Sequence, residues 1–439
     1  MRNKQRILFI APLPPPVHGS AMVSKYIKDS AKVQSVAQCD WVNLSTSRRM
    51  DEIGKGGAMK LLRFMGAYLK TLWLLLTHRY DLCYLAITCH GIGFLKDAPF
   101  VWLCKMFGCR VLIHQHNKGM SNCIDRWPYR WLIPYIYKRA RVMLLSWHLY
   151  PDIAKVVKRE QVVICVNGIA AEQQVNCGDS QVNVAEQRLN AAEQQVNSDG
   201  SQVNVALPRL NAAEQRVNCD DSQVNAASPR LNAAEQQVNC DESQVSAAIN
   251  RSEAASLSVN LLFLSNLIPS KGVYVLLDAC RILKERGLDF QCNFVGGETK
   301  EIDRARFEAE VQRRGLEGVV RYEGPKYGEE KEVYWRNSDV FVQPTFEDCF
   351  PLTIVEAMQH GLPVVSTTEG AVPDMVADGV NGFVCERKDV CGLAVALERL
   401  ILDAELRVRM GEVGYRIYKD KFTLEKFEER FAECLRRGE

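Results

Sequence analysis

The 439-residue sequence has no Cys-x-x-Cys pair, although it contains 16 cysteines. Cysteines scattered singly are typical of reduced thiols, and they argue against a zinc site or a disulfide framework. No stretch reaches the ~18 uninterrupted apolar residues of a membrane span. No Gly-x-Gly-x-x-Gly follows an expected strand, which argues against a dinucleotide-dependent oxidoreductase. The net charge is only +2, so nothing in the composition indicates a nucleic-acid partner.

The first residues, MRNKQRILFIAPLPPPVHG, place basic residues before an apolar run, as a signal peptide does. The run Ile7–Ile10 is far shorter than the ~7–15 residues of such a segment, and prolines follow it closely. We therefore expect a first buried strand. Together with the lack of a membrane span, this predicts a cytoplasmic protein.

A tandem repeat with a period of 21 residues runs from about Ala170 to Arg251. The octamer NAAEQQVN recurs with variations, and Val or Leu stands at every seventh residue. One alternative is a helical spacer or weak coiled coil. The other, which we favour, is a solvated insertion, because one Val or Leu per heptad buries too little to offset chain entropy. In either case we expect the repeat to carry no chemistry and to separate two globular parts.

Apolar runs alternate with helical patterns on both sides of the repeat. Expected buried strands include RILFIAPL, DLCYLAI and RVLIHQH before it and VNLLFLSNL, FQCNFVGG and DVFVQPT after it. A single helix is expected across HGSAMVSKYIKDSAKV. Strands that alternate with helices predict parallel sheets covered on both faces. The expected fold class is α/β, with two doubly wound Rossmann-like domains and a ligand cleft beyond the carboxyl ends of their strands.

Acidic residues follow the strand DVFVQPT in the segment EDCFPLTIVEAMQHG. Glu347 and Asp348 come at the end of the strand, Pro351 opens a helix, and Glu356 lies about one turn into it. Unpaired N–H groups at the helix start predict an anion site. Carboxylates beside such a site suit the hydroxyl groups of a sugar or a ribose. The alternative is a set of solvated loop acids.

Two other segments are expected at the same edge of the second sheet. Lys271 stands at a helix start, where its charge suits a phosphate group, and FVGGE ends the next strand with two glycines that let the backbone approach a ligand. Three such features in order on one sheet favour one common ligand site.

Together, these segments resemble those of a known protein family. From Leu261 onward, the chain resembles the family 4 retaining glycosyltransferases of the GT-B fold, the glycosyl transferase group 1 type. The motifs that match are SKGV, SDVFVQPT, EDCFPLTIVEAMQHGLPVVST and GAVPDMVADGVNGFV. The amino-terminal half matches more loosely, through ILFIAPLPPPVHGSAMVS, VLIHQHNKG and VNGI. The resemblance implies transfer of a sugar from a nucleotide diphosphate sugar to a hydroxyl of a glycan, lipid-linked or other acceptor, in cell-surface polysaccharide or glycoconjugate synthesis.

The resemblance also implies roles for particular residues. Glu356 corresponds to the second acid of a Glu-x7-Glu pair, which holds the donor ribose. Asp348 stands at the first acid's position, with the longer Glu347 as the alternative. Lys271 matches the lysine of an Arg-x4-Lys phosphate clamp, in which Asn266 replaces the arginine. The implied catalytic residues are His116, Asp348 and Glu356, and the implied substrate-binding residues are Gly19, Asn266, Lys271, Gly297, Glu347, Leu352 and Thr353.

The segment HQHNKG places His114 and His116 on the same side of a strand, which raises a metal site as an alternative. No third ligand stands at a supporting spacing, so we expect no metal and no cofactor. The resemblance implies instead that His116 positions the donor sugar and acceptor and that Gly19 belongs to a glycine loop.

Residues 55–80 are apolar, with Trp73 and five basic residues. This pattern fits an interfacial helix that contacts anionic lipid at the cytoplasmic face of the inner membrane. It also fits a core helix with a solvated basic face, which we favour.

The expected organisation has four parts. They are an acceptor-side domain at 1–168, the repeat at 169–252, a nucleotide-sugar domain at 253–421, and a helix at 422–439 that follows a crossing back to the first domain. Two alternative functions remain. One is a nucleotide-sugar epimerase or hydrolase on the same fold, and the other is a non-enzymatic scaffold whose repeat mediates interactions.

Overall fold

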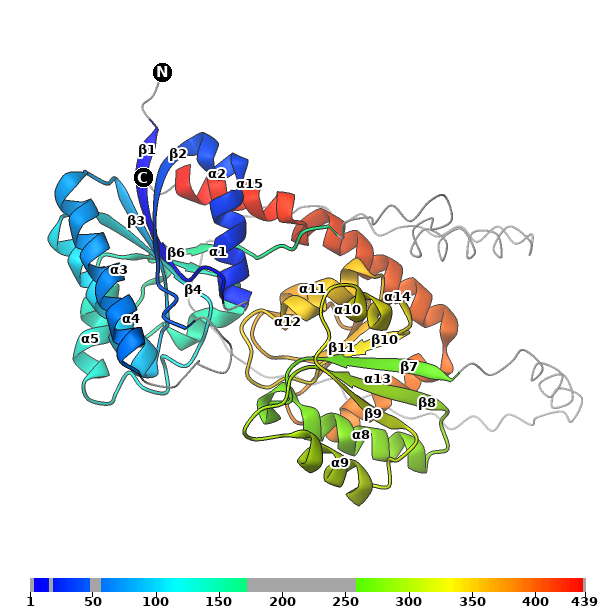
Figure 1. Ribbon diagram of the computed structural model, residues 1–439. Coiled ribbons are helices and arrows are strands. Elements are labelled where there is room, and N and C mark those ends of the chain that lie inside the picture. The colour runs from blue at the N-terminus through cyan, green and yellow to red at the C-terminus, as the bar shows by residue number, and fades with distance from the viewer. Residues whose placement is uncertain (1–3, 16–18, 48–56, 172–257, 437–439) are drawn as a thin grey trace, which may run out of the picture. The chain divides into compact units, whose positions relative to one another are not determined.

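The computed structural model describes residues 4–15, 19–47, 57–171 and 258–436 (Figure 1). Most of the repeat lies outside the described residues, so its expected helical or solvated character stays an expectation. Two six-stranded parallel sheets, each with helices on both faces, form the described part. Both sheets belong to one compact unit. No helix within the described ranges combines the length and the apolar content that crossing a membrane requires.

The first sheet has the strand order β2-β1-β3-β4-β5-β6. Helices α3, α4 and α5 pack on one face, whereas α1, α2 and the last helix, α15, pack on the other (Figure 1). The bounds of these elements are β1 Gln5–Ala11, α1 Gly19–Asp29, α2 Ala31–Val36, β2 Ala37–Asn43, α3 Ala58–Thr77, β3 Leu82–Ile87, α4 Gly91–Met106, β4 Arg110–Gln115, α5 Tyr129–Tyr137, β5 Arg141–Leu144, β6 Val162–Ile164 and α15 Leu424–Arg436.

The second sheet has the order β12-β11-β10-β7-β8-β9. Its elements are β7 Val259–Leu264, α8 Val273–Glu285, β8 Phe290–Val295, α9 Arg304–Arg313, β9 Val320–Gly324, α10 Glu329–Arg336, β10 Val340–Val342, α11 Leu352–Gln359, β11 Val364–Thr367, α12 Val372–Met375, β12 Gly382–Cys385, α13 Val390–Leu402 and α14 Ala404–Ile417.

The central strands are buried on both faces, as their uninterrupted apolar runs predict. In β1, Ile7, Phe9 and Ala11 face one apolar cluster, and Leu8 and Ile10 face the other. All five side chains are fully buried. The doubly wound α/β architecture expected from the sequence is confirmed.

The single helix expected after β1 is wrong in detail, because the structure has two helices, α1 and α2, at that place. The chain is extended at Ser30, whose hydroxyl accepts a hydrogen bond from the N–H group of Val33 and caps α2. A serine inside a helical pattern competes for backbone hydrogen bonds in this way.

The last helix, α15, packs on the first sheet. Phe427 and Phe431 are fully buried in the cluster that contains α1 and α2. Lys32 of α2 lies 2.8 Å from Glu429. At the start of α15, the backbone N–H of Leu424 donates to the carbonyl of Ile169 over 2.7 Å. The end of the chain therefore returns from α14, which packs on the second sheet, to the first sheet.

Candidate functional site

Strands β7 and β10 are neighbours in the second sheet, although the next strands, β8 and β11, lie on opposite sides of them. Ligands of such sheets bind beyond the carboxyl ends of the strands at this point of reversal. The segments that follow β7, β8 and β10 contain all the site residues expected in the second half of the chain. The topology therefore brings those residues to one edge of the sheet.

Lys271 and Asp348 form an ion pair at this edge. The Lys271 Nζ lies 2.5 Å from Asp348 Oδ2, and the two side chains are only 21% and 15% exposed. The turn after Lys271 lies close to the end of β10. A Cβ at Gly272 would come 2.2 Å from the Pro344 carbonyl oxygen, and its φ of +88° also requires glycine. A phosphate that binds Lys271 would have to compete with the Asp348 carboxylate.

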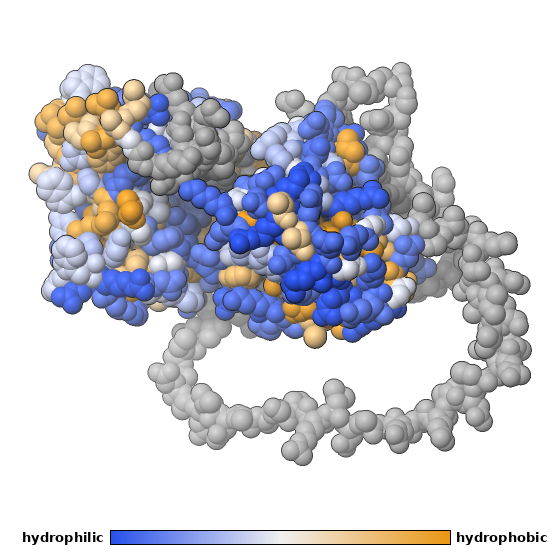
Figure 2. Space-filling model, turned by 60° about the horizontal axis from the view of Figure 1, so that its bottom comes forward, coloured by the Kyte–Doolittle hydropathy of each residue, from blue (hydrophilic) through white to orange (hydrophobic). Residues whose placement is uncertain are grey.

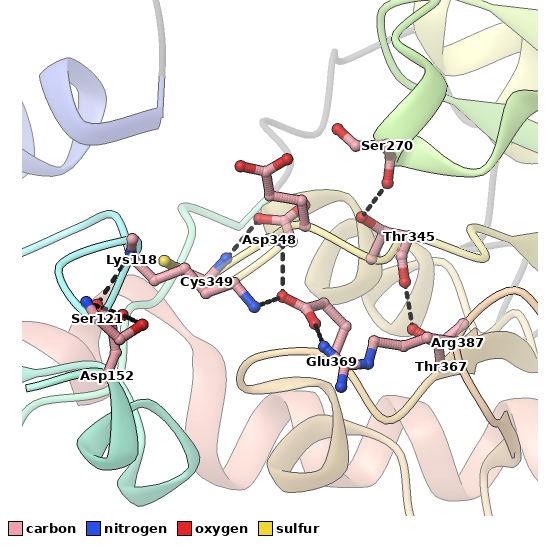
Figure 3. A network of polar contacts seen from close by, with 12 residues as sticks. Lys118, Ser121, Asp152, Ser270, Thr345, Asp348, Cys349, Thr367, Glu369 and Arg387 are labelled. Carbon is pink, nitrogen blue, oxygen red and sulfur yellow. Dashed lines mark hydrogen bonds and ion pairs between the residues drawn. The ribbon is translucent and has the colours of Figure 1, made fainter. Parts of the chain in front are cut away.

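A buried carboxylate holds the backbone at Asp348 (Figure 3). Glu369, 1% exposed, accepts the Asp348 N–H over 3.1 Å. Arg387 lies 3.2 Å from the other carboxylate oxygen of Glu369, and Lys118, in the loop after β4 of the first sheet, forms a second ion pair with Glu369. Glu369 therefore links a loop of the first sheet to the turn that contains Asp348.

The two adjacent acids of this turn have different surroundings. Asp348 Oδ1 accepts the N–H of Cys349 over 2.9 Å, and Asp348 Oδ2 meets Lys271. Glu347 is exposed, and its backbone carbonyl lies 3.4 Å from the Lys271 Nζ. Of the two acids, Asp348 is therefore the one whose carboxylate is fixed by contacts with neighbouring groups.

Glu356 lies in α11 and pairs with Lys331 of α10, with 2.8 Å between Nζ and Oε2. About a quarter of each side chain is exposed. The pKa of Tyr26 in α1 is raised, first by burial and then by the negative charge of Glu356. Glu356 therefore lies near enough to the first sheet's helix α1 to interact with it electrostatically.

Helix α11 begins at Leu352 and has no side-chain cap at Pro351. The Thr353 hydroxyl donates to Gln343 Oε1 over 2.6 Å, which ties the helix start to the segment after β10. A Cβ at Gly19, the first residue of α1, would contact the Leu352 side chain at 3.9 Å. Leu352, Thr353 and Gly19 are thus neighbours in space.

Asn266 and Gly297 are joined by a hydrogen bond. The Asn266 Oδ1 accepts the N–H of Gly297 over 3.0 Å, joining the loops after β7 and β8. Where the related pattern has an arginine, this chain uses an amide to hold two loops together. The geometry gives Asn266 a positioning role and no charge for a phosphate.

The first sheet has a cavity of about 1000 Å³ at the carboxyl ends of its strands. His116 and Ser20 line it together with Thr88. His114, in contrast, is fully buried, lies 2.6 Å from the Tyr84 hydroxyl and has a pKa lowered well below its usual value by burial. Within the described ranges, no group of three or more His, Cys, Asp or Glu side chains is arranged to hold a metal ion.

Residues 249–417 match the family model described as glycosyl transferases group 1. This segment is a group 1 glycosyltransferase domain. It contains β7 to β12 and thus the whole sheet edge with the Lys271–Asp348 ion pair, and also helix α11 with Glu356.

Curated relatives match about a third of the chain. The amylovoran biosynthesis glycosyltransferase AmsK of Erwinia amylovora is 31% identical over 148 residues, which are 32% of this chain and 36% of that relative. The D-inositol 3-phosphate glycosyltransferase of Corynebacterium jeikeium is 34% identical over 156 residues, 34% of this chain and 37% of that relative. The chain thus spans little more than a third of the length of these relatives.

Solved structures match the whole fold. A glycosyltransferase from Rickettsia africae has a TM-score of 0.62 at 14% identity, with 99% of each chain covered. Anabaena HepE in complex with UDP has a TM-score of 0.61 at 16% identity, covering 99% of this chain and 100% of that chain. WaaG, involved in lipopolysaccharide biosynthesis, reaches 0.58 at 14% identity, with 98% and 99% covered. The fold is GT-B, as the sequence predicted.

Sequence reasoning about the group 1 domain missed Glu369, Arg387, Lys331 and, in the first sheet, Lys118. Glu369 lies within STTEGAVPD, a stretch next to a recognised motif, so a signal was present. Its importance follows from burial and from its partners, neither of which the local sequence reveals.

Glu369→Gln is expected to lower the free energy of unfolding by about 1–2 kcal/mol, because the amide oxygen still accepts a hydrogen bond whereas two cations lose their charged partner. Lys118 and Arg387 are partly exposed, which limits the cost. Urea unfolding measures it. Glu308→Gln, at an exposed pair with Arg304, is the control and should cost less than 0.5 kcal/mol, an order-of-magnitude limit for surface pairs. Equal effects of the two substitutions would contradict a structural role for Glu369.

Proposed function

We propose that this protein is a retaining glycosyltransferase that moves a sugar from a nucleotide diphosphate sugar to a hydroxyl of a glycan, lipid-linked or other acceptor in polysaccharide or glycoconjugate synthesis. The observation that carries the proposal is the Lys271–Asp348 ion pair at the edge where β7 and β10 diverge, with Glu356 in the first turns of α11, the helix that follows β10 at the same edge. The relatives AmsK and the D-inositol 3-phosphate glycosyltransferase, which are glycosyltransferases by name, support the reaction class.

The donor binds with its diphosphate between Lys271 and the start of α11. The N–H groups of Leu352 and Thr353 stand at that helix start, where the helix dipole favours an anion. When the bond to the sugar breaks, negative charge grows on the diphosphate. Lys271, which is mostly buried, stabilises that charge more strongly than it would in water.

The two acids and the histidine act on neutral hydroxyls. Glu356 holds the ribose of the nucleotide through hydrogen bonds that it accepts, and binding displaces part of its contact with Lys331. Asp348 accepts from a hydroxyl of the transferred sugar once the diphosphate has taken over Lys271. His116 orients the acceptor and the sugar from the cavity of the first sheet. Asn266 and Gly297 keep the two loops around the diphosphate in place.

The acceptor hydroxyl attacks from the face that the diphosphate leaves, which retains the configuration at the sugar carbon. No step requires a second carboxylic acid of the kind that glycoside hydrolases use. The departing diphosphate can itself take up the proton of the attacking hydroxyl.

The test of this function is a panel of nucleotide sugars, with release of the nucleotide diphosphate as the readout. We expect release with one donor class and a further rise when acceptor is added. Release that yields only free sugar, with or without acceptors, would favour a hydrolase, and interconversion of donors without release would favour an epimerase.

Glu356→Gln is expected to raise the donor dissociation constant and to lower turnover, together by about tenfold, because the neutral amide accepts weaker hydrogen bonds than a carboxylate does. Isothermal titration with the free nucleotide diphosphate separates binding from turnover. Glu332→Gln in α10 is a matched control that should leave donor binding and turnover unchanged, since Glu332 pairs with His360, the residue after α11. Near-native activity of Glu356→Gln would remove Glu356 from the ribose site.

Removal of residues 172–251, with a short flexible link in their place, is expected to leave sugar transfer within about twofold, because no proposed site residue lies there. Activity and thermal unfolding check this. Unchanged transfer would dismiss the non-enzymatic scaffold, and loss of folding would mean that the repeat packs on the two domains.

A further inference from the structure

The outward side of α3 is apolar. Met59, Leu62, Leu69, Trp73 and Leu76 recur every three to seven residues, and each is between 57% and 66% exposed. Residues at these spacings share one side of a helix. The inward side is apolar as well, since Leu74 and Leu75 are buried against the first sheet. The core-helix reading of this segment, which the sequence favoured, accounts for the inward side only.

The apolar surface continues over the neighbouring helices. Helix α4 packs on α3, and α5 packs on α4, all on the same face of the first sheet (Figure 1). Figure 2 shows orange apolar patches on the left of the view, where the first sheet and these helices lie. Exposed apolar residues of α4, α5 and the chain adjoining them are Ile92, Trp102, Met106, Phe107, Trp127, Trp131 and Tyr135.

Tryptophan is concentrated on this surface. Four of the seven tryptophans in the chain, Trp73, Trp102, Trp127 and Trp131, lie in or next to α3, α4 and α5, and each is at least 42% exposed. Trp127 reaches 79% and Trp131 67%. Exposed tryptophans gather where an apolar layer meets water, because the ring is apolar and its N–H is polar.

The charge of the same segment is strongly positive. Residues 58–141 contain thirteen Lys and Arg but three Asp and no Glu, and one of the three, Asp97, is buried. The whole chain, in contrast, is nearly balanced. Of these basic residues, those exposed in or beside α3 and α5 include Lys70, Arg79, Arg126, Arg130 and Lys138, whereas Lys118 pairs with Glu369. A second copy of the chain would place these exposed cations against one another, which disfavours a symmetric dimer. An anionic lipid surface complements both the charge and the apolar side chains.

We propose that the outward surface of α3, α4 and α5 docks on a bilayer that contains anionic lipid. The apolar side chains enter the boundary between headgroups and acyl chains, and the basic side chains meet the lipid phosphates. The cavity beside His116 adjoins this surface, because Leu61 and Ile92 line the cavity and are 62% and 85% exposed. Docking therefore brings the mouth of the cavity close to molecules carried in the membrane.

The experiment is co-sedimentation of the full chain with vesicles of phosphatidylcholine alone or with 30% phosphatidylglycerol, a composition chosen for the assay. We expect binding to the anionic vesicles and at least about fivefold less to the neutral ones. In L62E/L69E, binding to anionic vesicles should fall by about fivefold or more, because each glutamate opposes both burial and the lipid charge. Neither leucine lines the cavity.

The matched control is Leu402→Glu at the end of α13, where leucine is 68% exposed on the second sheet's side of the chain. It should bind vesicles as the unaltered protein does. Equal binding by L62E/L69E would overturn the proposal, and so would a dimer in light scattering that L62E/L69E dissociates. Thermal unfolding of both variants shows that they are folded. The assay uses no donor, so its outcome is independent of the proposed sugar transfer.

Discussion

Replacing Lys271 with alanine is expected to reduce sugar transfer by about 10²–10³-fold, the loss typical when one group that stabilises developing negative charge is removed. The expected loss is at the upper end for two reasons. Lys271 is mostly buried, so little water replaces its charge, and Asn266 stands where a second fixed cation would share the work. Steady-state turnover at saturating donor measures the effect.

Two variants show whether the loss of turnover comes from the missing charge or from a change in the fold. Lys271→Arg keeps a cation and should recover part of the turnover, although its planar group does not match the Nζ position. Lys300→Ala, at an exposed position of the same domain, should leave turnover unchanged. A loss of less than about threefold in Lys271→Ala would mean that another cation, such as Lys118, stabilises the diphosphate.

The strands of the two sheets could be predicted wherever burial on both faces makes them uninterrupted apolar runs. Strand β1 is of this kind. Strand β2, Ala37–Asn43, lies at the edge of the first sheet and mixes buried with exposed positions, so it carries no such run. The break between α1 and α2 escaped prediction, because a cap at Ser30 and an interior serine look alike in sequence.

The site could be predicted in part for a similar reason. Lys271, Asp348 and Glu356 stand at fixed offsets from strand ends, and a local pattern reveals such offsets. Glu369 comes 21 positions after Asp348 and meets it only because the loop after β11 folds back beneath the turn. Lys118 comes from the other sheet altogether. Contacts of this kind depend on how the chain packs, so no regular spacing in the sequence reveals them.

The surface of α3 shows a third limit. Its sequence, AMKLLRFMGAYLKTLWLLLT, is apolar on both sides, and composition alone does not say which side meets the sheet. The buried residues Thr71, Leu74 and Leu75 identify the inward side, which leaves Trp73 outside. The exposed apolar side of α3 therefore indicates a partner only once the packing of the neighbouring helices is known.

Asp348→Ala is expected to cost far more turnover than Glu347→Ala. If Asp348 accepts a hydrogen bond from a buried sugar hydroxyl, its loss should cost on the order of 2 kcal/mol, or about 30-fold in turnover. The contacts of the two acids support a larger effect for Asp348→Ala than for Glu347→Ala. Both Asp348 oxygens are already bonded at the sheet edge, to Lys271 and to the Cys349 N–H, whereas the Glu347 side chain is exposed.

The comparison also separates a direct role of Asp348 from its pairing with Lys271. Asp348→Asn keeps the size and one acceptor oxygen but frees the Lys271 charge. If Asp348 contacts the sugar, Asp348→Asn should bind the free nucleotide diphosphate at least as tightly as the unaltered protein and still turn over slowly. If its main role is to neutralise Lys271, binding should tighten and turnover should remain near native. Greater damage from Glu347→Ala than from Asp348→Ala would shift the assignment by one residue, because adjacent side chains on an extended segment point in opposite directions.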